Sequence, residues 1–225
     1  MMRMEKVTIL EVKQSVFEDN GKDAELLRSE LTAAGTLLVN LMSSPGSGKT
    51  TTLLAVAKKL SGKVKLGVME ADIDSAVDAE KMLNAGIKSI QIHTGGMCHL
   101  DADMTRQGVR EIGTDGLDVI VLENVGNLVC PAEFDTGAHK NVTILSVPEG
   151  HDKPLKYPLM YETCDLLIVN KIDVIDYFDF DKQKAVEYAK MRNPNIDVIF
   201  ISAKTGDGID EVADWILNAY YSFKK

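Results

Sequence analysis

The sequence is short of positive charge: its 225 residues include 25 Lys and Arg against 34 Asp and Glu, which gives a formal net charge of −9. Nucleic-acid grooves and anionic membrane surfaces both bind through clustered Lys and Arg, so this balance argues against either as a main partner. The chain also lacks a run of about 18 apolar residues, and its first residues, MMRMEKVTILEV, lack the apolar core of a signal peptide. We therefore expect a cytoplasmic protein with no nucleic-acid or membrane partner.

Cysteine is scarce as well. Three cysteines, an odd number scattered along a chain of this length, do not make a disulfide framework and are expected to be reduced thiols. The sequence has no internal repeat, low-complexity tract or long linker. We therefore expect a single domain over residues 1–225, in which residues 1–36 form an N-terminal extension with a helix (23–34) that packs on the core.

Short β-branched runs alternate with longer helical patterns along the chain. The apolar runs are TLLVNLM, VKLGVME, SIQIH, DVIVLE, VTILSV, DLLIVN and DVIFIS. Near-continuous apolar strands are typical of a mostly parallel sheet that is buried on both faces. Helices are expected between them at 50–60, 75–85, 101–112, 181–191 and 208–220. The alternation predicts a doubly wound α/β domain with helices on both faces of the sheet.

The stretch SSPGSGKTT, residues 43–51, follows the first core strand. It matches the phosphate-binding frame G-x-x-x-x-G-K-[ST], except that Ser43 occupies the position of the first glycine. Ser43 is expected at the end of the strand, where a residue with a small side chain can replace glycine if its backbone φ is negative. The loop predicts a P-loop NTPase in which the backbone turns around the phosphates, the lysine adds a point charge and the threonine hydroxyl ligates Mg²⁺. Its predicted nucleotide-binding residues are Gly46, Ser47, Gly48, Lys49, Thr50 and Thr51.

Two later stretches indicate which base is bound. NKID (170–173) and SAKTG (202–206) each follow a strand and resemble the guanine-recognition motifs of GTPases. In that resemblance the carboxylate of Asp173 accepts hydrogen bonds from the two guanine donors, which adenine lacks. The resemblance also gives roles to neighbouring residues, which brace the loop or cover the base: Asn170, Lys171, Ser202, Ala203 and Lys204. We therefore expect GTP as the nucleotide.

Acidic residues follow two other strands. Asp72 and Glu123 are the candidates for holding Mg²⁺ directly or through water, and Asp74 is the alternative to Asp72. Glu123 stands where a Walker-B carboxylate belongs, in the stretch ENVGN. Together with Lys49 and Thr50 these two acids are the candidate catalytic residues. No glutamine or arginine stands out as a water-activating group, so intrinsic GTP hydrolysis is expected to be slow.

A second candidate site involves the cysteines. Cys98 and His99 lie in GGMCHLDAD, and Cys130 follows the Glu123 stretch by a few residues. Thiolate and imidazole ligands suit Zn²⁺ or Ni²⁺, although three ligands leave a tetrahedral site incomplete. Two chains sharing the ion, or a water molecule, would complete it; unrelated thiols beside a surface histidine are the alternative. The remaining residues of these types are expected to be structural: Cys164, His93, His139 and His151.

Four motifs occur in order over essentially the entire chain: SSPGSGKTT, MCHLDAD, ENVGNLVCPAEFD and NKID. Together they resemble the HypB family, GTPases that assist nickel insertion during [NiFe]-hydrogenase maturation. The resemblance implies the dimerising SIMIBI class of P-loop GTPases, a GTP-dependent homodimer, and a Ni²⁺ or Zn²⁺ site at the subunit interface built from Cys98, His99 and Cys130. It also implies a HypA-type metallochaperone as partner and delivery to the hydrogenase large subunit.

Other functions remain open from the sequence. A maturation GTPase for urease or a cobalamin enzyme would share the fold, but the urease type is expected to use a Cys-Pro-His arrangement, whereas this chain has Met97-Cys98-His99 and Cys130-Pro131-Ala132. A non-catalytic metal-storage or metal-sensing protein would bind metal without hydrolysing GTP. The chain lacks the His-rich tract and Cys-rich N-terminal motif of some family members, so nickel storage is not expected.

Overall fold

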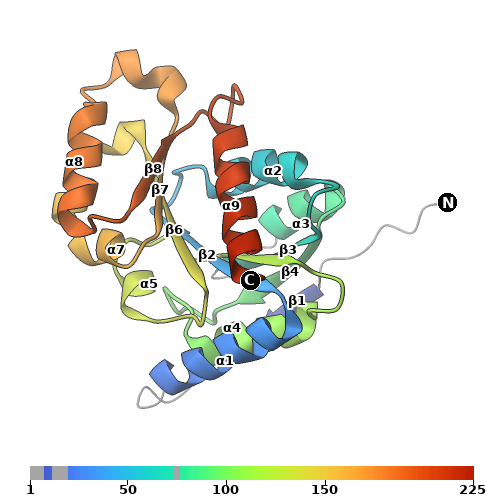
Figure 1. Ribbon diagram of the computed structural model, residues 1–225. Helices are drawn as coiled ribbons and strands as arrows, with labels where there is room; N and C mark the ends of the chain where they lie inside the picture. Colours follow the sequence, from blue (N-terminus) through green and yellow to red (C-terminus); the bar gives the residue numbers. More distant parts are fainter. Residues whose placement is uncertain (1–7, 12–19, 73–76) are drawn as a thin grey trace.

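Eight parallel strands form one sheet in the described residues of the computed structural model, which are 8–11, 20–72 and 77–225. The spatial order is β1-β4-β3-β5-β2-β6-β7-β8, with helices on both faces (Figure 1). The strands are Thr8–Glu11 (β1), Leu37–Ser43 (β2), Leu66–Asp72 (β3), Lys88–His93 (β4), Val119–Glu123 (β5), Lys140–Ser146 (β6), Leu166–Asn170 (β7) and Asp197–Phe200 (β8).

Nine helices accompany these strands within the same residues. They are Asn20–Ala34 (α1), Lys49–Leu60 (α2), Val77–Asn84 (α3), Ala102–Ile112 (α4), Cys130–Glu133 (α5), Lys153–Lys156 (α6), Pro158–Glu162 (α7), Lys182–Arg192 (α8) and Ile209–Phe223 (α9). Two 3₁₀ turns, Val147–Glu149 (η2) and Ile172–Tyr177 (η3), follow β6 and β7. In the part of the chain that is described, no helix is long and apolar enough to cross a membrane.

The doubly wound α/β fold predicted from the sequence is confirmed, and all seven predicted core strands are present. The sequence interpretation missed β1, which pairs in parallel with β4 at the sheet edge within the N-terminal extension. A four-residue edge strand gives too short a pattern to be told from coil. It also missed α5, α6 and α7, which have four or five residues each and a proline in the first turn. The predicted helix start at residue 75 lies outside the described residues.

The core divides into two layers because side chains alternate along each strand. In β2, Leu37, Val39 and Leu41 pack with α2 and α9 on one face. Leu38 packs toward α1 and α4 on the other face, and Met42 packs there with residues of α7 and α8. The central strands are therefore covered on both faces. The loops that follow them leave the sheet at the carboxyl ends of the strands, which the helices do not cover.

Three asparagines cross the middle of the sheet. Asn124 is fully buried and donates from Nδ2 to Oδ1 of Asn40 at 3.1 Å, and Asn40 donates in turn to Oδ1 of Asn141 at 3.1 Å. A buried amide is costly unless it is paired, so this chain of hydrogen bonds favours one relative position of β2, β5 and β6. It thereby fixes the strand end from which the Glu123 loop departs.

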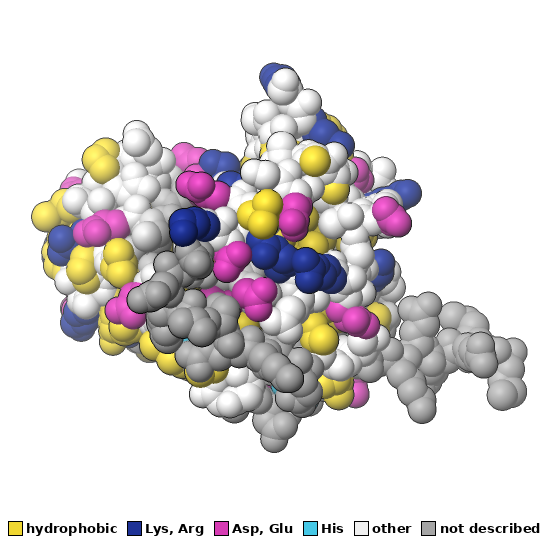
Figure 2. Space-filling view, turned by 90° about the horizontal axis from the view of Figure 1, so that it is seen from below, with side chains coloured by type: hydrophobic (Ala, Val, Ile, Leu, Met, Phe, Trp, Pro, Cys, Tyr) yellow, Lys and Arg dark blue, Asp and Glu magenta, His cyan; other side chains and the backbone are white. Residues whose placement is uncertain are grey.

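The surface carries both signs of charge. Figure 2 shows Lys and Arg side chains interspersed with Asp and Glu on the face seen from below, and no broad basic surface is visible among the coloured residues of that face. This pattern agrees with the overall excess of acidic residues.

The start of α9 depends on a glycine. Gly208 is its N-cap residue in the left-handed region, with φ 69°, and a Cβ there would lie 2.3 Å from the carbonyl oxygen of Phe200. An alanine would have to adopt a strained backbone and also displace the end of β8. Gly206, two residues earlier, has φ 93° but open space around a Cβ.

We predict that Gly208→Ala lowers the free energy of unfolding by about 2 kcal/mol or more, because backbone strain and overpacking add. Gly206→Ala is the matched control and is expected to lose only the strain contribution, about 1 kcal/mol. Urea denaturation followed by circular dichroism measures both. Equal losses in the two variants would contradict the close packing of Gly208 against β8.

Candidate functional site

The loop after β2 is shaped to receive phosphates. Ser43, which stands in place of the usual glycine, is the last residue of β2 and is completely buried. Its Oγ accepts hydrogen bonds from Ser47 Oγ at 2.6 Å and Lys49 Nζ at 3.0 Å. Since Ser43 has no positive φ, a serine fits this position without strain. The replacement of the consensus glycine by Ser43 therefore causes no backbone strain in the loop.

Gly48 closes the loop and begins α2. Its φ is 99°, and a Cβ at this position would lie 2.5 Å from Nδ2 of Asn170. The close approach allows Asn170 Nδ2 to donate to the carbonyl oxygen of Ser47 at 3.0 Å. Lys171 reaches the same loop, with Nζ 2.7 Å from the carbonyl oxygen of Gly46. The phosphate loop and the NKID stretch are therefore held directly against each other.

The two predicted guanine-recognition stretches also contact each other. Asn170 Oδ1 accepts hydrogen bonds from the backbone N–H groups of Lys171 at 2.7 Å and Ala203 at 3.1 Å. Ser202, fully buried, donates from Oγ to Asp173 Oδ1 at 2.8 Å. Asp173 and Lys204 are exposed. The Asp173 carboxylate is thus held from one side by Ser202 and otherwise open to solvent, so it can accept further hydrogen bonds.

A cavity of about 560 Å³ lies beside the phosphate loop. It brings together residues at or near the carboxyl ends of β2, β3, β4 and β5, and one residue of α3: Pro45, Gly46, Gly48, Lys49, Thr50, Thr51, Glu70, Ala71, Asp72, Lys81, Gln91, Glu123, Asn124, Val125 and Gly126. Within it, Thr50 Oγ1 donates to Glu123 Oε1 at 2.9 Å, and the Glu123 side chain is buried. Asp72 lines the same cavity, whereas Asp74 lies outside the described residues.

Several polar residues of this region were not predicted, among them Glu70 and Asn124 of the cavity lining. Lys81 and Gln91 line the cavity from α3 and β4. Glu149, at the end of η2, accepts a hydrogen bond from Ser44 Oγ of the phosphate loop and others from the N–H and Oγ of Ser146. The sequence did contain a signal for Glu149. It follows Ser146, at the end of β6, by three residues, which is the spacing of a capping box.

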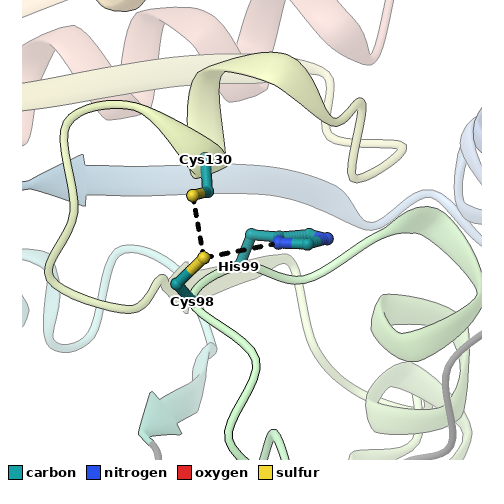
Figure 3. Close-up of side chains that lie close together, drawn as sticks. All are labelled: Cys98, His99 and Cys130. Carbon is teal, nitrogen blue, oxygen red and sulfur yellow. Dashed lines mark hydrogen bonds between the residues drawn. The ribbon is translucent and has the colours of Figure 1, made fainter.

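The predicted metal ligands converge at a second place on the same edge. Figure 3 shows Cys98 and His99, from the loop after β4, facing Cys130 at the start of α5. Their ligand atoms lie within 4.8 Å of one another, with Cys98 Sγ 2.8 Å from Cys130 Sγ and 3.9 Å from His99 Nδ1. Among the described residues this is the only group of three or more His, Cys, Asp and Glu side chains close enough to share an ion. Two sulfurs and one nitrogen suit a borderline-soft divalent ion.

The surroundings of Cys98 and His99 affect their readiness to bind a metal in opposite directions. The hydrogen bond with Cys130, together with burial, raises the pKa of the Cys98 thiol, and burial lowers the pKa of His99. A neutral imidazole keeps a lone pair for a metal, whereas a thiol with a raised pKa must give up its proton before its sulfur binds one. Two supporting residues were not predicted. The ring of Phe134 stacks on His99 at 3.7 Å between centroids, and Asn127 Nδ2 donates to Cys130 Sγ at 3.4 Å.

The other cysteine and two of the other histidines serve the fold, as expected. Cys164 is buried in an apolar cluster, where burial raises the pKa of its thiol. Nδ1 of His139 accepts a hydrogen bond from the Leu38 N–H at 3.1 Å, and Nδ1 of His151 accepts one from the Asp181 N–H at 3.2 Å. Neither histidine belongs to the metal-ligand group.

Comparison with known proteins shows the family to which the chain belongs. Residues 37–200 match the family described as "CobW/HypB/UreG, nucleotide-binding domain". The hydrogenase maturation factor HypB of Escherichia coli K12 is 42% identical over 213 residues, which cover 95% of this chain and 73% of that protein. The structure is also similar to that of HypB from Helicobacter pylori in complex with nickel, with a TM-score of 0.86, 33% identity and coverage of 92% and 98% of the two chains.

A more distant likeness concerns the fold alone. The signal recognition particle receptor FtsY of Elizabethkingia anophelis, in complex with GDP, superposes with a TM-score of 0.53 at 14% identity, over 86% of this chain and 72% of that one. The predicted α/β fold of P-loop type, with one mostly parallel sheet and helices on both faces, is thereby confirmed. Because the match to HypB extends over nearly the whole chain, the protein belongs to the CobW/HypB/UreG family of nucleotide-binding proteins and, within it, to the HypB family of hydrogenase maturation factors.

Proposed function

We propose that this protein is a GTP-hydrolysing metallochaperone that assists nickel insertion during [NiFe]-hydrogenase maturation. The observation that carries the proposal is the loop between β5 and α5. It begins at Glu123 in the nucleotide cavity and ends at Cys130 in the ligand group. A single short segment thus joins a phosphate-binding site to a metal-binding site, which is the connection that a nucleotide-controlled metal carrier needs.

GTP is the proposed nucleotide. Lys49 and the N–H groups of the phosphate loop bind the phosphates at the start of α2. Asp173 accepts from the two guanine donors, and its position is fixed by Ser202. Asn170 braces the loops, while Lys171, Ala203 and Lys204 flank the base. Adenine would leave the Asp173 carboxylate without its donors, so the site discriminates strongly for guanine.

Mg²⁺ fits the nucleotide cavity because the groups available there are hard oxygen donors. The Thr50 hydroxyl and the Glu123 carboxylate, already 2.9 Å apart, would hold it, with Asp72 contributing directly or through water. When bound, Mg²⁺ offsets the negative charge of the phosphates during hydrolysis. Lys49 orients the terminal phosphate, and with no glutamine or arginine assigned to the attacking water, the intrinsic hydrolysis rate of this site is slow.

Nickel is the proposed cargo, held by Cys98, His99 and Cys130. The nickel complex of the H. pylori relative supports this choice. Zn²⁺ suits the same ligands and competes by availability. Three ligands from one chain leave the coordination incomplete, so we propose a GTP-dependent homodimer that places the site at the subunit interface and shares its ions across a two-fold axis.

The further proposed partners are a HypA-type metallochaperone, which exchanges nickel with this protein, and the hydrogenase large subunit, which receives it. Both assignments rest on family membership. The cytoplasm is the proposed location, since the acidic balance of the chain offers no basic surface for membranes or nucleic acids.

We predict that Asp173→Asn weakens GDP binding about 100-fold or more, because an amide cannot accept from both guanine donors. The same variant is expected to gain affinity for xanthosine diphosphate, whose 2-oxo group accepts a hydrogen bond from the new amide. Fluorescent-nucleotide titrations measure both. Asp176→Asn, an exposed carboxylate in the same turn, is the control and should bind GDP normally. Unchanged GDP affinity in Asp173→Asn would refute the assignment.

We predict that Glu123→Gln reduces single-turnover GTP hydrolysis about 100-fold while GDP still binds, because an amide oxygen is a poorer Mg²⁺ ligand than a carboxylate. Asp72→Asn should have a smaller effect if Asp72 acts through water. Quenched reactions with excess protein give the rates, and Mg²⁺ titrations should show that the Glu123 variant needs more of the ion. Native-like hydrolysis in Glu123→Gln would remove this residue from the proposed site.

We predict that a non-hydrolysable GTP analogue converts the native protein from monomer to dimer, and that the dimer retains Ni²⁺. The double variant Cys98→Ala/Cys130→Ala should lose the metal, whereas Cys164→Ala, which removes only the buried thiol, should keep it. Light scattering coupled to size exclusion, with metal analysis of each peak, measures both properties. If mass is indifferent to nucleotide and metal binds the monomer equally well, the coupling is wrong. Metal binding without any GTP hydrolysis would favour a storage or sensing protein.

A further inference from the structure

The two loops that carry the metal ligands are not held together by the sheet. Cys98 and His99 follow β4, and Cys130 follows β5. In the sheet these strands are separated by β3, which pairs with both. The ligand group therefore needs a support outside the sheet to set the distance between the two loops.

Besides the stacking of Phe134 on His99, one side chain outside both ligand-bearing segments contacts both of them. Asn20, the first residue of α1, accepts a hydrogen bond at Oδ1 from the backbone N–H of Ala102 at 2.9 Å, and it donates from Nδ2 to the carbonyl oxygen of Asp135 at 3.1 Å. Ala102 lies three residues beyond His99, and Asp135 lies two residues beyond the end of α5. The amide of Asn20 thus bridges the two chain segments that present the ligands.

Charged residues fix α1 against the same two segments. Arg28 forms a two-pronged contact with Asp135, from Nη2 to the carboxylate oxygens at 2.9 and 2.8 Å, and donates from Nε to the carbonyl oxygen of Ala138 at 3.1 Å. Arg106 of α4 is buried and donates to the carbonyl oxygen of Asp23 at 2.8 Å. α1 consequently lies along α4, as Figure 1 shows, and is tied to the segment after α5 as well.

Covering the sheet does not by itself explain these contacts. The apolar side of α1, formed by Ala24, Leu27 and Leu31, is buried against the core and is sufficient for that role. The contacts of Asn20 and Arg28 are polar and are directed at the ligand-bearing segments. Paired polar contacts fix direction and separation, which apolar packing does only loosely.

We propose that α1 is a clamp on the metal-binding loops, in which Asn20 is a positioning residue that sets the separation of Cys98 and Cys130. The proposal deepens the metal-carrier function and rests on it. Asn20 touches no ligand atom; it acts through the backbones of Ala102 and Asp135. Removing a residue that is hydrogen-bonded directly to a metal ligand typically changes the metal affinity about 10- to 100-fold, and the indirect contacts of Asn20 are expected at the lower end of that range.

Three variants of the full chain test the clamp. Asn20→Ala removes both contacts, Asn20→Asp keeps the acceptor for the Ala102 N–H but loses the donor to Asp135, and Glu25→Ala changes an exposed residue of the same helix as control. The first measurement needs no metal: dibromobimane becomes fluorescent when it bridges two neighbouring thiols, so its rate reports the closeness of Cys98 and Cys130. The second is Ni²⁺ affinity by competition with a chromogenic chelator. GDP affinity and the melting temperature are followed in parallel.

We expect Asn20→Ala to lower both the bridging rate and the Ni²⁺ affinity about tenfold, Asn20→Asp to lower them less, and Glu25→Ala to leave them unchanged, with GDP affinity native in all three. Bridging and Ni²⁺ binding within twofold of native in Asn20→Ala would overturn the clamp. So would an equal loss of GDP binding, because that result indicates general unfolding. If bridging depends on Asn20 but the native protein binds no Ni²⁺, the clamp stands and the metal-carrier function fails.

Discussion

Parallel pairing of all the strands is the constraint on which both sites depend. In the described part of the chain every strand points the same way, so the loops after β2, β3, β4, β5, β7 and β8 all leave the sheet at one edge. β2 lies between β5 and β6, at the point where the order of the strands in the sheet reverses. Ligands of doubly wound folds bind at this switch point. Residues far apart in the sequence therefore contact each other there, as the hydrogen bond between Thr50 and Glu123 shows.

Much of this arrangement could be predicted from the sequence because the signals were local. The phosphate loop, NKID and SAKTG each place their residue types at fixed spacings after an apolar run, and a parallel sheet then brings them to one edge. Ser43 differs from the consensus glycine of the motif, yet its backbone has no positive φ, so glycine is not required there. The backbone conformation that a motif position needs is therefore a better criterion than the consensus residue. The pairing of Cys98 with Cys130 was reached through the order of motifs and the family resemblance, since spacing alone left chance placement open.

The parts that could not be predicted depend on contacts between distant segments. Asn20 meets Asp135 across more than a hundred residues, Glu149 meets Ser44 across a similar span, and neither pair leaves a periodic pattern. Phe134 stacks on His99 only because α5 turns the following segment back over the ligand group. β1 and the short helices α5, α6 and α7 could not be predicted for a different reason. Four or five residues are too few to show the hydrophobic periodicity of a strand or a helix.

The segment between Glu123 and Cys130 is constrained unevenly along its length, and this limits how one site can influence the other. At its start, Asn124 is fully buried and hydrogen-bonded to Asn40, so the strand end is fixed to the sheet. Val125 and Leu128 are also buried, whereas Val129, next to Cys130, is about half exposed. Beyond Asn124 no such amide contact anchors the segment to the sheet in the described residues, and there Val125 and Gly126 line the cavity beside the phosphate loop. A ligand in that cavity would lie against Val125 and Gly126, beyond the part of the segment that the buried amides hold to β5.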